Sequence, residues 1–196
     1  MSSPEKLACA FTAFDTYNSR DLHTEESDGQ KFPKELLYSI RMTEKLAQYA
    51  PDAPEHVRIA ARCQHIGRWE IPRTTFPMDR KGYLQWRSRL AMHHCDIAAK
   101  ILEGCGFDAA TVERVKFLLQ KKELRQHHPD TQLLEDVICL VFIEHYLDDF
   151  ALQHEDDKVV DILKKTIPKM SPRALDQVAA IRMTDKVKKL LQEALA

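Results

Sequence analysis

The sequence predicts an all-α fold, a bundle of about seven or eight helices forming a single domain over residues 1–196. Apolar residues recur at helical spacings of three and four along most of the chain, whereas no segment shows the two-residue period of a half-buried strand. Only 5 glycines occur, which is few for an α/β nucleotide-binding fold with its glycine-dependent turns. A chain of 196 residues is also long enough for one well-buried domain.

The helical spacing places eight segments in order along the chain. The expected helices span residues 6–17, 33–49, 56–66, 82–103, 108–124, 132–152, 156–166 and 172–196. Pro33 and Pro172 suit the first turn of a helix, Asp108 suits the capping position before one, and Gly104 suits the end of another. The polar residues 18–28 are expected to form a loop. Residues 132–152 are the most apolar segment and are expected at the centre.

Composition and charge narrow the class of protein. The net charge is -1, so no overall field attracts nucleic acid or a membrane surface, and neither is expected as a partner. The most apolar run, residues 137–143, is too short to span a bilayer. The start of the chain, Met1–Cys9, is interrupted by acidic Glu5 and does not read as a secretory signal. We therefore expect a cytoplasmic protein whose five cysteines are reduced.

Two short motifs invite comparison with class I aminoacyl-tRNA synthetases, namely HIGR at residues 65–68 and KMS at residues 169–171. In that class the HIGH-like motif follows a parallel strand and opens a helix beneath ATP. Here HIGR ends a helix instead, because apolar residues precede it at helical spacing. Ser171 precedes Pro172 and is expected to cap a helix. A synthetase is therefore the weakest of the functional hypotheses.

Several longer segments resemble an uncharacterised family, domain of unknown function 4202, some of whose members carry the label glutamyl-tRNA synthetase. The resemblance rests on the segments ELLYSIRM, ARCQHIGRWEIPR, YLQWR, LEDVICLVF and KMS. It covers nearly the whole chain. It implies no function.

A more distant resemblance is to the HD superfamily of metallohydrolases. The segment that carries it is LYSIRMTEKLAQYAPDAPEHVRIAARCQHIGRWEIP. Tyr38 falls on the first histidine of that superfamily, Gln64 on the histidine of the paired His-Asp, and His65 on its aspartate. The resemblance implies an HD-like helical core over about residues 33–152, with the C-terminal helices of residues 156–196 packed on it.

The resemblance further implies a metal site made of His65, His94 and Glu144, with His65 and Glu144 in catalytic roles. Two histidines and one glutamate would suit Zn or Fe, and Mn is a further candidate. Gln64 departs from the superfamily pattern, because a neutral amide is a weak ligand for a divalent ion. His94 is favoured over His93 for its match to that pattern. A surface histidine pair is the competing interpretation.

Arginines gather around His65 in the sequence and suggest an anion site. The predicted substrate-binding residues are Arg41, Arg62, Arg68, Arg73, Trp69 and Gln64. Guanidinium groups hold phosphate or carboxylate through two parallel hydrogen bonds, and a tryptophan can stack on a base or an arginine. The alternative is that these arginines pair with carboxylates and so lock helices together, the candidates being Glu35, Glu44, Glu135 and Asp136. Glu135 and Asp136 are expected to be buried.

Two functional hypotheses from different classes remain open on the sequence. One is a metal-dependent phosphohydrolase acting on a small phosphorylated or nucleotide-like metabolite. The other is a non-catalytic anion- or nucleotide-binding module derived from the HD fold, which the substitution at Gln64 favours. The oligomeric state is left open.

Overall fold

The computed structural model describes residues 2–195 and divides into two compact units. Unit 1 comprises Met1–Lys122 and unit 2 comprises Glu123–Ala196. The described residues contain ten α-helices, four short 3₁₀ helices and one two-stranded hairpin. The all-α prediction is confirmed, and the helix count is slightly above the seven or eight expected. The single-domain prediction and its HD-like core stay predictions.

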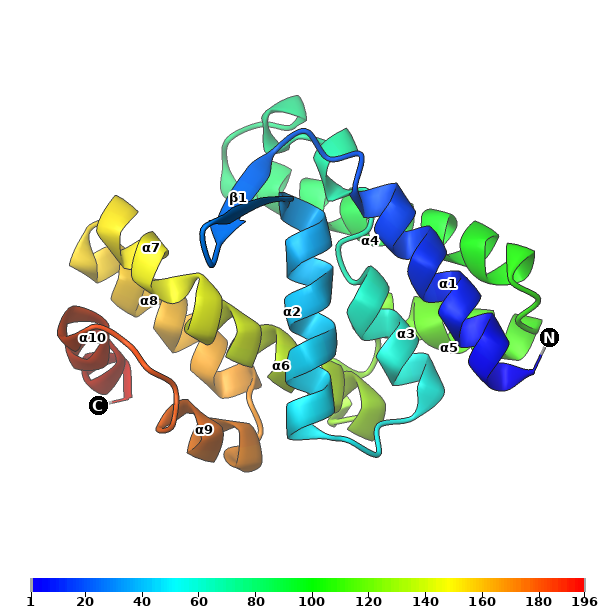
Figure 1. Cartoon of the computed structure of the whole chain (residues 1–196). Coiled ribbons are helices and arrows are strands. Elements are labelled where there is room, and N and C mark those ends of the chain that lie inside the picture. The colour runs from blue at the N-terminus through cyan, green and yellow to red at the C-terminus, as the bar shows by residue number, and fades with distance from the viewer. Residues whose placement is uncertain (1, 196) are drawn as a thin grey trace. The chain divides into compact units, whose positions relative to one another are not determined.

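Unit 1 is built from five α-helices and a hairpin (Figure 1). Its elements are α1 Ser3–Asn18, β1 Thr24–Ser27, β2 Gln30–Pro33, α2 Lys34–Tyr49, α3 Glu55–Cys63, η1 Arg68–Glu70, η2 Arg73–Thr75, α4 Arg80–Gly104 and α5 Ala109–Leu119. Helix α3 contacts α1, α2 and α5, while α4 packs against α1 and α5. The fully buried side chains of this unit include Phe14, Met42, Ile59, Ile66 and Leu118.

The hairpin corrects the expectation of a plain loop after the first helix. Strands β1 and β2 pair antiparallel, and Ser27 lies opposite Gln30. Asp28 and Gly29 form the two-residue turn with φ of 51° and 75°, the conformation that an Asp-Gly pair favours between twisted strands. Because β2 runs directly into α2, the hairpin sets where that helix begins.

Unit 2 contains the remaining helices. Its elements are η3 Leu124–Gln126, α6 Pro129–His145, α7 Leu147–Gln153, α8 Asp156–Thr166, η4 Ile167–Lys169, α9 Pro172–Val178 and α10 Asp185–Leu195. Two expected helices are each divided, one at Tyr146 between α6 and α7 and one at residues 179–184 between α9 and α10. These breaks account for the larger helix count.

The KMS motif has a structural role in unit 2. Ser171 caps α9, accepting a hydrogen bond at Oγ from the backbone N–H of Ala174 at 3.2 Å, as the sequence predicts. Its own backbone N–H and hydroxyl donate to Asp136, at 2.8 and 2.6 Å. The motif therefore joins α9 to α6. Glu135 and Asp136 are both buried, at 3% exposure each, as expected.

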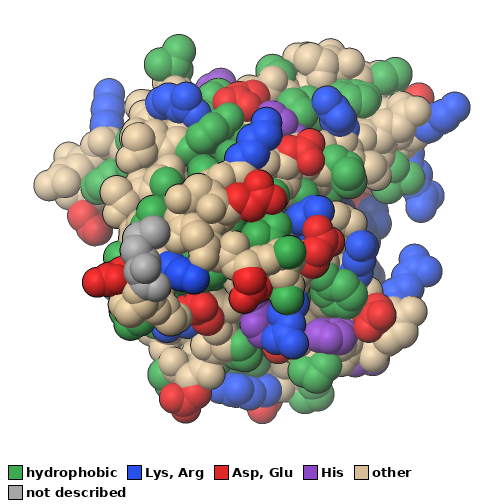
Figure 2. All heavy atoms as spheres, turned by 90° about the vertical axis from the view of Figure 1, so that its right-hand side faces the viewer, with side chains coloured by type: hydrophobic (Ala, Val, Ile, Leu, Met, Phe, Trp, Pro, Cys, Tyr) green, Lys and Arg blue, Asp and Glu red, His purple; other side chains and the backbone are tan. Residues whose placement is uncertain are grey.

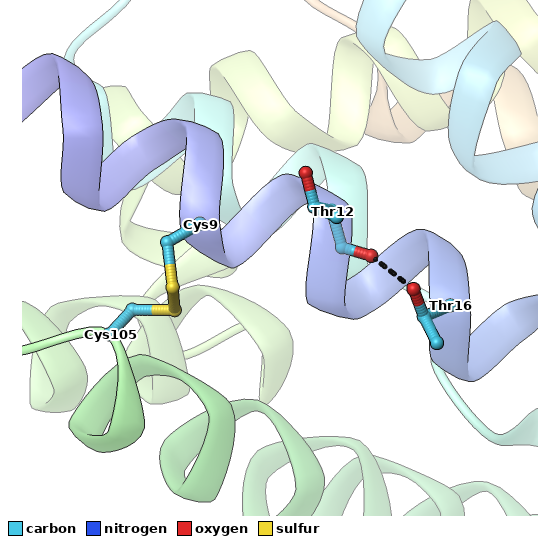
Figure 3. Close-up of a disulfide and its surroundings, with 4 residues drawn as sticks. All are labelled: Cys9, Thr12, Thr16 and Cys105. Carbon is cyan, nitrogen blue, oxygen red and sulfur yellow. Dashed lines mark hydrogen bonds between the residues drawn. A yellow bond between two sulfur atoms is a disulfide. The ribbon is translucent and has the colours of Figure 1, made fainter.

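A disulfide joins Cys9 on α1 to Cys105, the residue that follows α4 (Figure 3). The expectation that all five cysteines are reduced is wrong for this pair. Their separation of 96 residues left no local pattern in the sequence. The free cysteines within residues 2–195 are Cys63, Cys95 and Cys139, and all three are buried. Disulfides are rare in cytosolic proteins, so the cytoplasmic location stays a prediction.

Two further observations concern the surface. None of the helices within residues 2–195 has both the length and the apolar character needed to span a membrane. On the face drawn in Figure 2, acidic, basic and hydrophobic side chains are interspersed, without an extended area of one charge. This mixture agrees with the net charge of -1.

Candidate functional site

The segment after α3 carries His65 and Arg68 on a sharp turn. Gly67, at φ 67°, has the left-handed conformation that lets the chain reverse into η1. A Cβ at Gly67 would lie 2.6 Å from Ile97 Cδ1, so a larger residue would be strained and would clash. The sequence predicts that HIGR ends a helix, but α3 stops at Cys63, so the motif lies just after the helix, with His65 and Arg68 on the turn.

Asn18, at the end of α1, braces this turn against α2. Its side chain is 1% exposed. Its Oδ1 accepts from the backbone N–H of Gly67 at 3.3 Å, and its Nδ2 donates to the backbone carbonyl of Glu35 at 3.4 Å. Asp21 accepts from the backbone N–H of Glu35 at 3.3 Å. Asn18 and Asp21 therefore connect the loop after α1 to the start of α2, and Asn18 also connects it to the turn at Gly67.

Glu35 lies in the first turn of α2 and faces the turn that Asn18 braces. Its carboxylate oxygens lie 3.5 Å from His65 Nδ1 and 3.7 Å from Arg68 Nε. Burial raises the pKa of Glu35 to about 7, with the nearby Asp21 adding to the rise and Arg68 opposing it. Glu35 can therefore both hold and release a proton near neutral pH.

His65 stacks on Tyr38, with ring centroids 4.1 Å apart and an interplanar angle of 13°. Its side chain is 26% exposed. Burial, together with Arg68 and three other cations, lowers the pKa of His65 well below its ordinary value. The imidazole is thus neutral at physiological pH and has one ring nitrogen that can accept a hydrogen bond.

His94 lies on α4 with its ring centroid 6.0 Å from that of His65. Its Nδ1 lies 2.6 Å from the carbonyl oxygen of Ile66, which can only accept, so Nδ1 carries the proton and Nε2 the lone pair. Burial, with His65 adding to the effect, lowers the pKa of His94 to about 3. His93 is engaged elsewhere, 2.8 Å from a carboxylate oxygen of Glu70.

We call the following six residues the His65 cluster. Glu35, Tyr38, His65, Arg68 and His94 lie close to one another, and Gln64 is included because it directly precedes His65 in the chain. Gln64 is 5% exposed, and its Oε1 has no hydrogen-bond partner among the described residues. Such a buried acceptor costs stability unless a donor satisfies it.

Comparison with known proteins identifies the family of this chain. Residues 8–191 match the family described as Domain of unknown function (DUF4202). The chain belongs to this family. No curated protein and no solved structure matches the chain. The DUF4202 match covers both units, including the whole His65 cluster, but carries no function with it.

Three of the predicted arginines of this DUF4202 chain bind other parts of the protein. Arg62 donates hydrogen bonds from Nε and Nη2 to the two carboxylate oxygens of Asp15, at 2.8 and 2.6 Å. Its Nη1 also donates to the hydroxyl oxygen of Thr43 at 3.2 Å. Arg41 forms an ion pair with Glu25 of the hairpin. Arg73 donates to three backbone carbonyls of the loop before α4. Their assignment to substrate binding stays a prediction.

Arg68 differs from these three. Its guanidinium lies 4.8 Å from the centre of the Trp86 ring, and its side chain is 34% exposed. Among the described residues its terminal nitrogens make no hydrogen bond, and its Nε lies 3.7 Å from Glu35. Trp69, the predicted stacking residue, packs against Tyr17 with ring centroids 5.8 Å apart. Arg68 is thus positioned by an aromatic face and a carboxylate while its donors stay available.

The three predicted metal ligands belong to two different units. His65 and His94 lie in the cluster of unit 1, whereas Glu144 lies on α6 in unit 2, 3.8 Å from His145. Within residues 2–195, no group of three His, Cys, Asp or Glu side chains is placed to hold a metal ion. The set of His65, His94 and Glu144 stays a prediction.

Sequence reasoning considered Glu35 only as an ion-pair partner of the arginines, and it missed the lysines near His65. Lys34 and Lys121, with Arg87 and Arg68, are the cations whose charge lowers the pKa of His65. A usable signal existed for Glu35, since it lies three residues before Tyr38 and therefore on the same helical face. Lys121 follows α5 in a left-handed conformation, with φ of 53°, and no local pattern marked it.

Proposed function

We propose that the His65 cluster binds a small phosphorylated metabolite. The observation that carries the proposal is Arg68, a half-buried guanidinium held against Trp86 with its terminal donors available. A guanidinium matches the geometry of a phosphate edge through two parallel hydrogen bonds. Arg68 would hold the phosphate, and the neutral His65 beside it would accept a hydrogen bond from the bound molecule.

The surroundings of Arg68 support an anion over a neutral ligand. Four cations act on His65, namely Lys34, Arg68, Arg87 and Lys121. They belong to α2, η1, α4 and the residues just after α5. Lys121 also interacts with a further residue, but Lys34, Arg68 and Arg87 repel one another, and an anion bound among them would relieve that repulsion.

The test is isothermal titration with inorganic phosphate on the wild type and on Arg68→Gln. Loss of a charged, bidentate donor should weaken binding by about tenfold or more. Arg89→Gln is the matched control, because Arg89 is an exposed arginine on α4 that is not among the cations acting on His65. Equal affinity in all three proteins, or no binding by the wild type, would overturn the proposal.

A second candidate, hydrolysis of the bound phosphate compound, is favoured by one observation. The pKa of Glu35 is about 7, which suits a group that must take a proton from water and return it. The distant resemblance to HD metallohydrolases also supports it. In that reading a divalent metal would activate the attacking water.

Two measurements test the hydrolytic candidate. Release of inorganic phosphate from a panel of phosphomonoesters should be lost in Glu35→Gln, which keeps the size of the side chain and removes its titration. Metal content, measured by elemental mass spectrometry in the wild type and in His65→Ala, tests the metal prediction. Stoichiometric Zn, Fe or Mn that falls in the variant would support it. Phosphate binding without release would leave the non-catalytic binding module.

A further inference from the structure

The Cys9–Cys105 disulfide lies beside an open groove on the surface of unit 1. One face of α1, from Glu5 to Arg20, lines this groove together with Ile101 of α4, and its volume is about 780 Å³. Cys9 is half-buried and belongs to the lining, whereas Cys105 is only 3% exposed. A thiol that attacks a disulfide must reach one of its two sulfur atoms. A small thiol in the groove can therefore reach the sulfur of Cys9.

The other cysteines of the described chain do not share this exposure. Cys63, Cys95 and Cys139 are free thiols, and all three are buried. Burial shields a thiol from reagents in solution, while an accessible disulfide stays open to exchange. Within residues 2–195, Cys9 is thus the position at which thiol chemistry is expected first.

The disulfide also holds the first half of α1. Between Ser3 and Cys9 no side chain is buried, so this half of the helix adds little to the core. Ser3 does donate an exposed hydrogen bond to Glu55 at 2.5 Å. The second half is held by Phe14, which is fully buried, and by the ion pair of Asp15 with α3. Breaking the disulfide would therefore leave α1 attached mainly through its second half.

The end of α1 braces the turn that carries His65 and Arg68. The backbone N–H of Gly67 donates to the side chain of Asn18 at 3.3 Å, and Gly67 is buried. A buried, hydrogen-bonded amide exchanges its hydrogen with water when the surrounding structure opens. The exchange rate at Gly67 therefore reports how firmly α1 is docked at this turn.

We propose that the Cys9–Cys105 disulfide is a site of thiol–disulfide exchange, which a small thiol opens at Cys9, and that opening it loosens the brace of α1 on the turn at Gly67. The attacking thiolate forms a bond to Cys9 Sγ as the Cys9–Cys105 bond breaks. The Cys105 sulfur leaves with the electron pair and takes up a proton. This inference does not depend on the binding of phosphate.

A second thiol completes the reduction. Its thiolate attacks the reagent sulfur of the mixed disulfide, and Cys9 leaves as a thiolate and takes up a proton. Two reagent thiols are thereby oxidised to one disulfide, while the disulfide of the protein is reduced to two thiols.

The first test treats the folded, oxidised protein with 2-mercaptoethanol at about pH 8, where part of the reagent is ionised. The reaction is stopped with acid, the protein is digested with pepsin, and the adduct is located by mass spectrometry. The mixed disulfide should be on Cys9. Cys63, Cys95 and Cys139 should carry none, which shows that the protein stays folded. A bond that opens only in denaturant, or an adduct mainly on Cys105, would overturn the proposal.

Two single variants compare the access of the two sulfur atoms directly. Cys105→Ser leaves Cys9 free, and Cys9→Ser leaves Cys105 free. With the disulfide form of 2-mercaptoethanol as the reagent, Cys9 should be modified about tenfold or more faster than Cys105, because Cys105 is buried. Equal rates would remove the argument for attack at Cys9.

The second test follows hydrogen exchange at the Gly67 amide by NMR. Reduction of the wild type should speed this exchange by about tenfold or more, while the amide of Val141, in α6 of unit 2, should not change. The double variant Cys9→Ser/Cys105→Ser should match the reduced wild type and should not respond to thiol. Unchanged exchange at Gly67 after reduction would overturn the proposed link between the disulfide and the turn.

Discussion

Two buried carboxylates, Glu35 in unit 1 and Asp136 in unit 2, have opposite surroundings. Both are nearly inaccessible, at 6% and 3% exposure. Asp136 accepts hydrogen bonds from Gln132 at 2.9 Å and from the backbone N–H and hydroxyl of Ser171 at 2.8 and 2.6 Å. The oxygens of Glu35 lie no closer than 3.5 Å to His65 and 3.7 Å to Arg68.

The comparison shows that burial alone does not decide what a carboxylate does. Short hydrogen bonds fix the carboxylate of Asp136, and this residue joins α6 to the cap of α9. Glu35 lacks such donors, so burial raises its pKa to about 7 and leaves it able to exchange a proton. One carboxylate is suited to structure and the other to chemistry.

The largest expected effect is that of Asp136→Ala. It removes the acceptor of three hydrogen bonds and should lower the free energy of unfolding by about 3–5 kcal/mol. Urea denaturation followed by far-ultraviolet circular dichroism measures this, because both units are helical. The control is Asp176→Ala, an exposed carboxylate on α9. A loss below about 1 kcal/mol would contradict the structural role of Asp136.

At high pH, Glu35→Gln should instead raise the free energy of unfolding. Because the pKa of Glu35 rises from 4.5 unfolded to about 7 folded, its protonated form stabilises the fold at low pH, and this contribution is lost as the pH rises through about 7. The variant cannot ionise, so at about pH 8 it should be more stable than the wild type by up to about 3 kcal/mol, at 1.4 kcal/mol per pKa unit. Below about pH 4.5 the difference should vanish.

Tryptophan fluorescence reports this change locally, since Trp69 and Trp86 both belong to unit 1. Glu26→Gln, at an exposed position on β1, is the control. A Glu35→Gln variant that is less stable than the wild type at about pH 8 would show that Arg68 stabilises the ionised carboxylate, which would remove the contrast with Asp136.

His94→Asn tests how the same site affects stability at acid pH. The pKa of His94 is lowered from 6.5 to about 3, so its contribution to stability is present above about pH 6.5 and is lost as the pH falls below it. Asparagine keeps a donor for the carbonyl of Ile66. The loss of stability between about pH 7 and pH 5 should therefore shrink by about 2 kcal/mol in the variant. An unchanged pH profile would show that His94 does not titrate as its surroundings indicate.

The smallest effect is expected for Arg62→Lys. Lysine cannot reproduce the two-point grip on Asp15, so the free energy of unfolding should fall by about 1 kcal/mol while phosphate affinity stays unchanged. Thermal unfolding and phosphate titration measure the two quantities separately. Weaker phosphate binding at unchanged stability would instead support the sequence-based assignment of Arg62 to the ligand.

Local patterns predicted much of the fold. The cap at Ser171 and the buried pair of Glu135 and Asp136 each follow from a few neighbouring residues. The helix expected over residues 56–66 is present too, but it ends at Cys63, before HIGR. The hairpin could have been found too, because Asp28-Gly29 is a strong turn signal. It was missed because the flanking residues Thr24–Ser27 are polar and do not alternate.

The site was only partly predictable for a different reason. His65 and Arg68 share a motif, but their partners come from distant segments, with Glu35 on α2 and His94 on α4. Whether an arginine is already engaged, as Arg62 is, depends on residues as far away as Asp15. Such pairings follow from how the helices pack, and no spacing within one helix encodes them.

The Cys9–Cys105 bond turns most of unit 1 into a covalent ring, since the two cysteines are 96 residues apart. All six residues of the His65 cluster lie inside that ring, whereas Lys121 and unit 2 lie outside it. A single protease cut anywhere between Cys9 and Cys105 would therefore leave one connected molecule, which would separate into two fragments only after reduction. Protein cut once in this segment would keep all six residues of the His65 cluster in one disulfide-linked molecule.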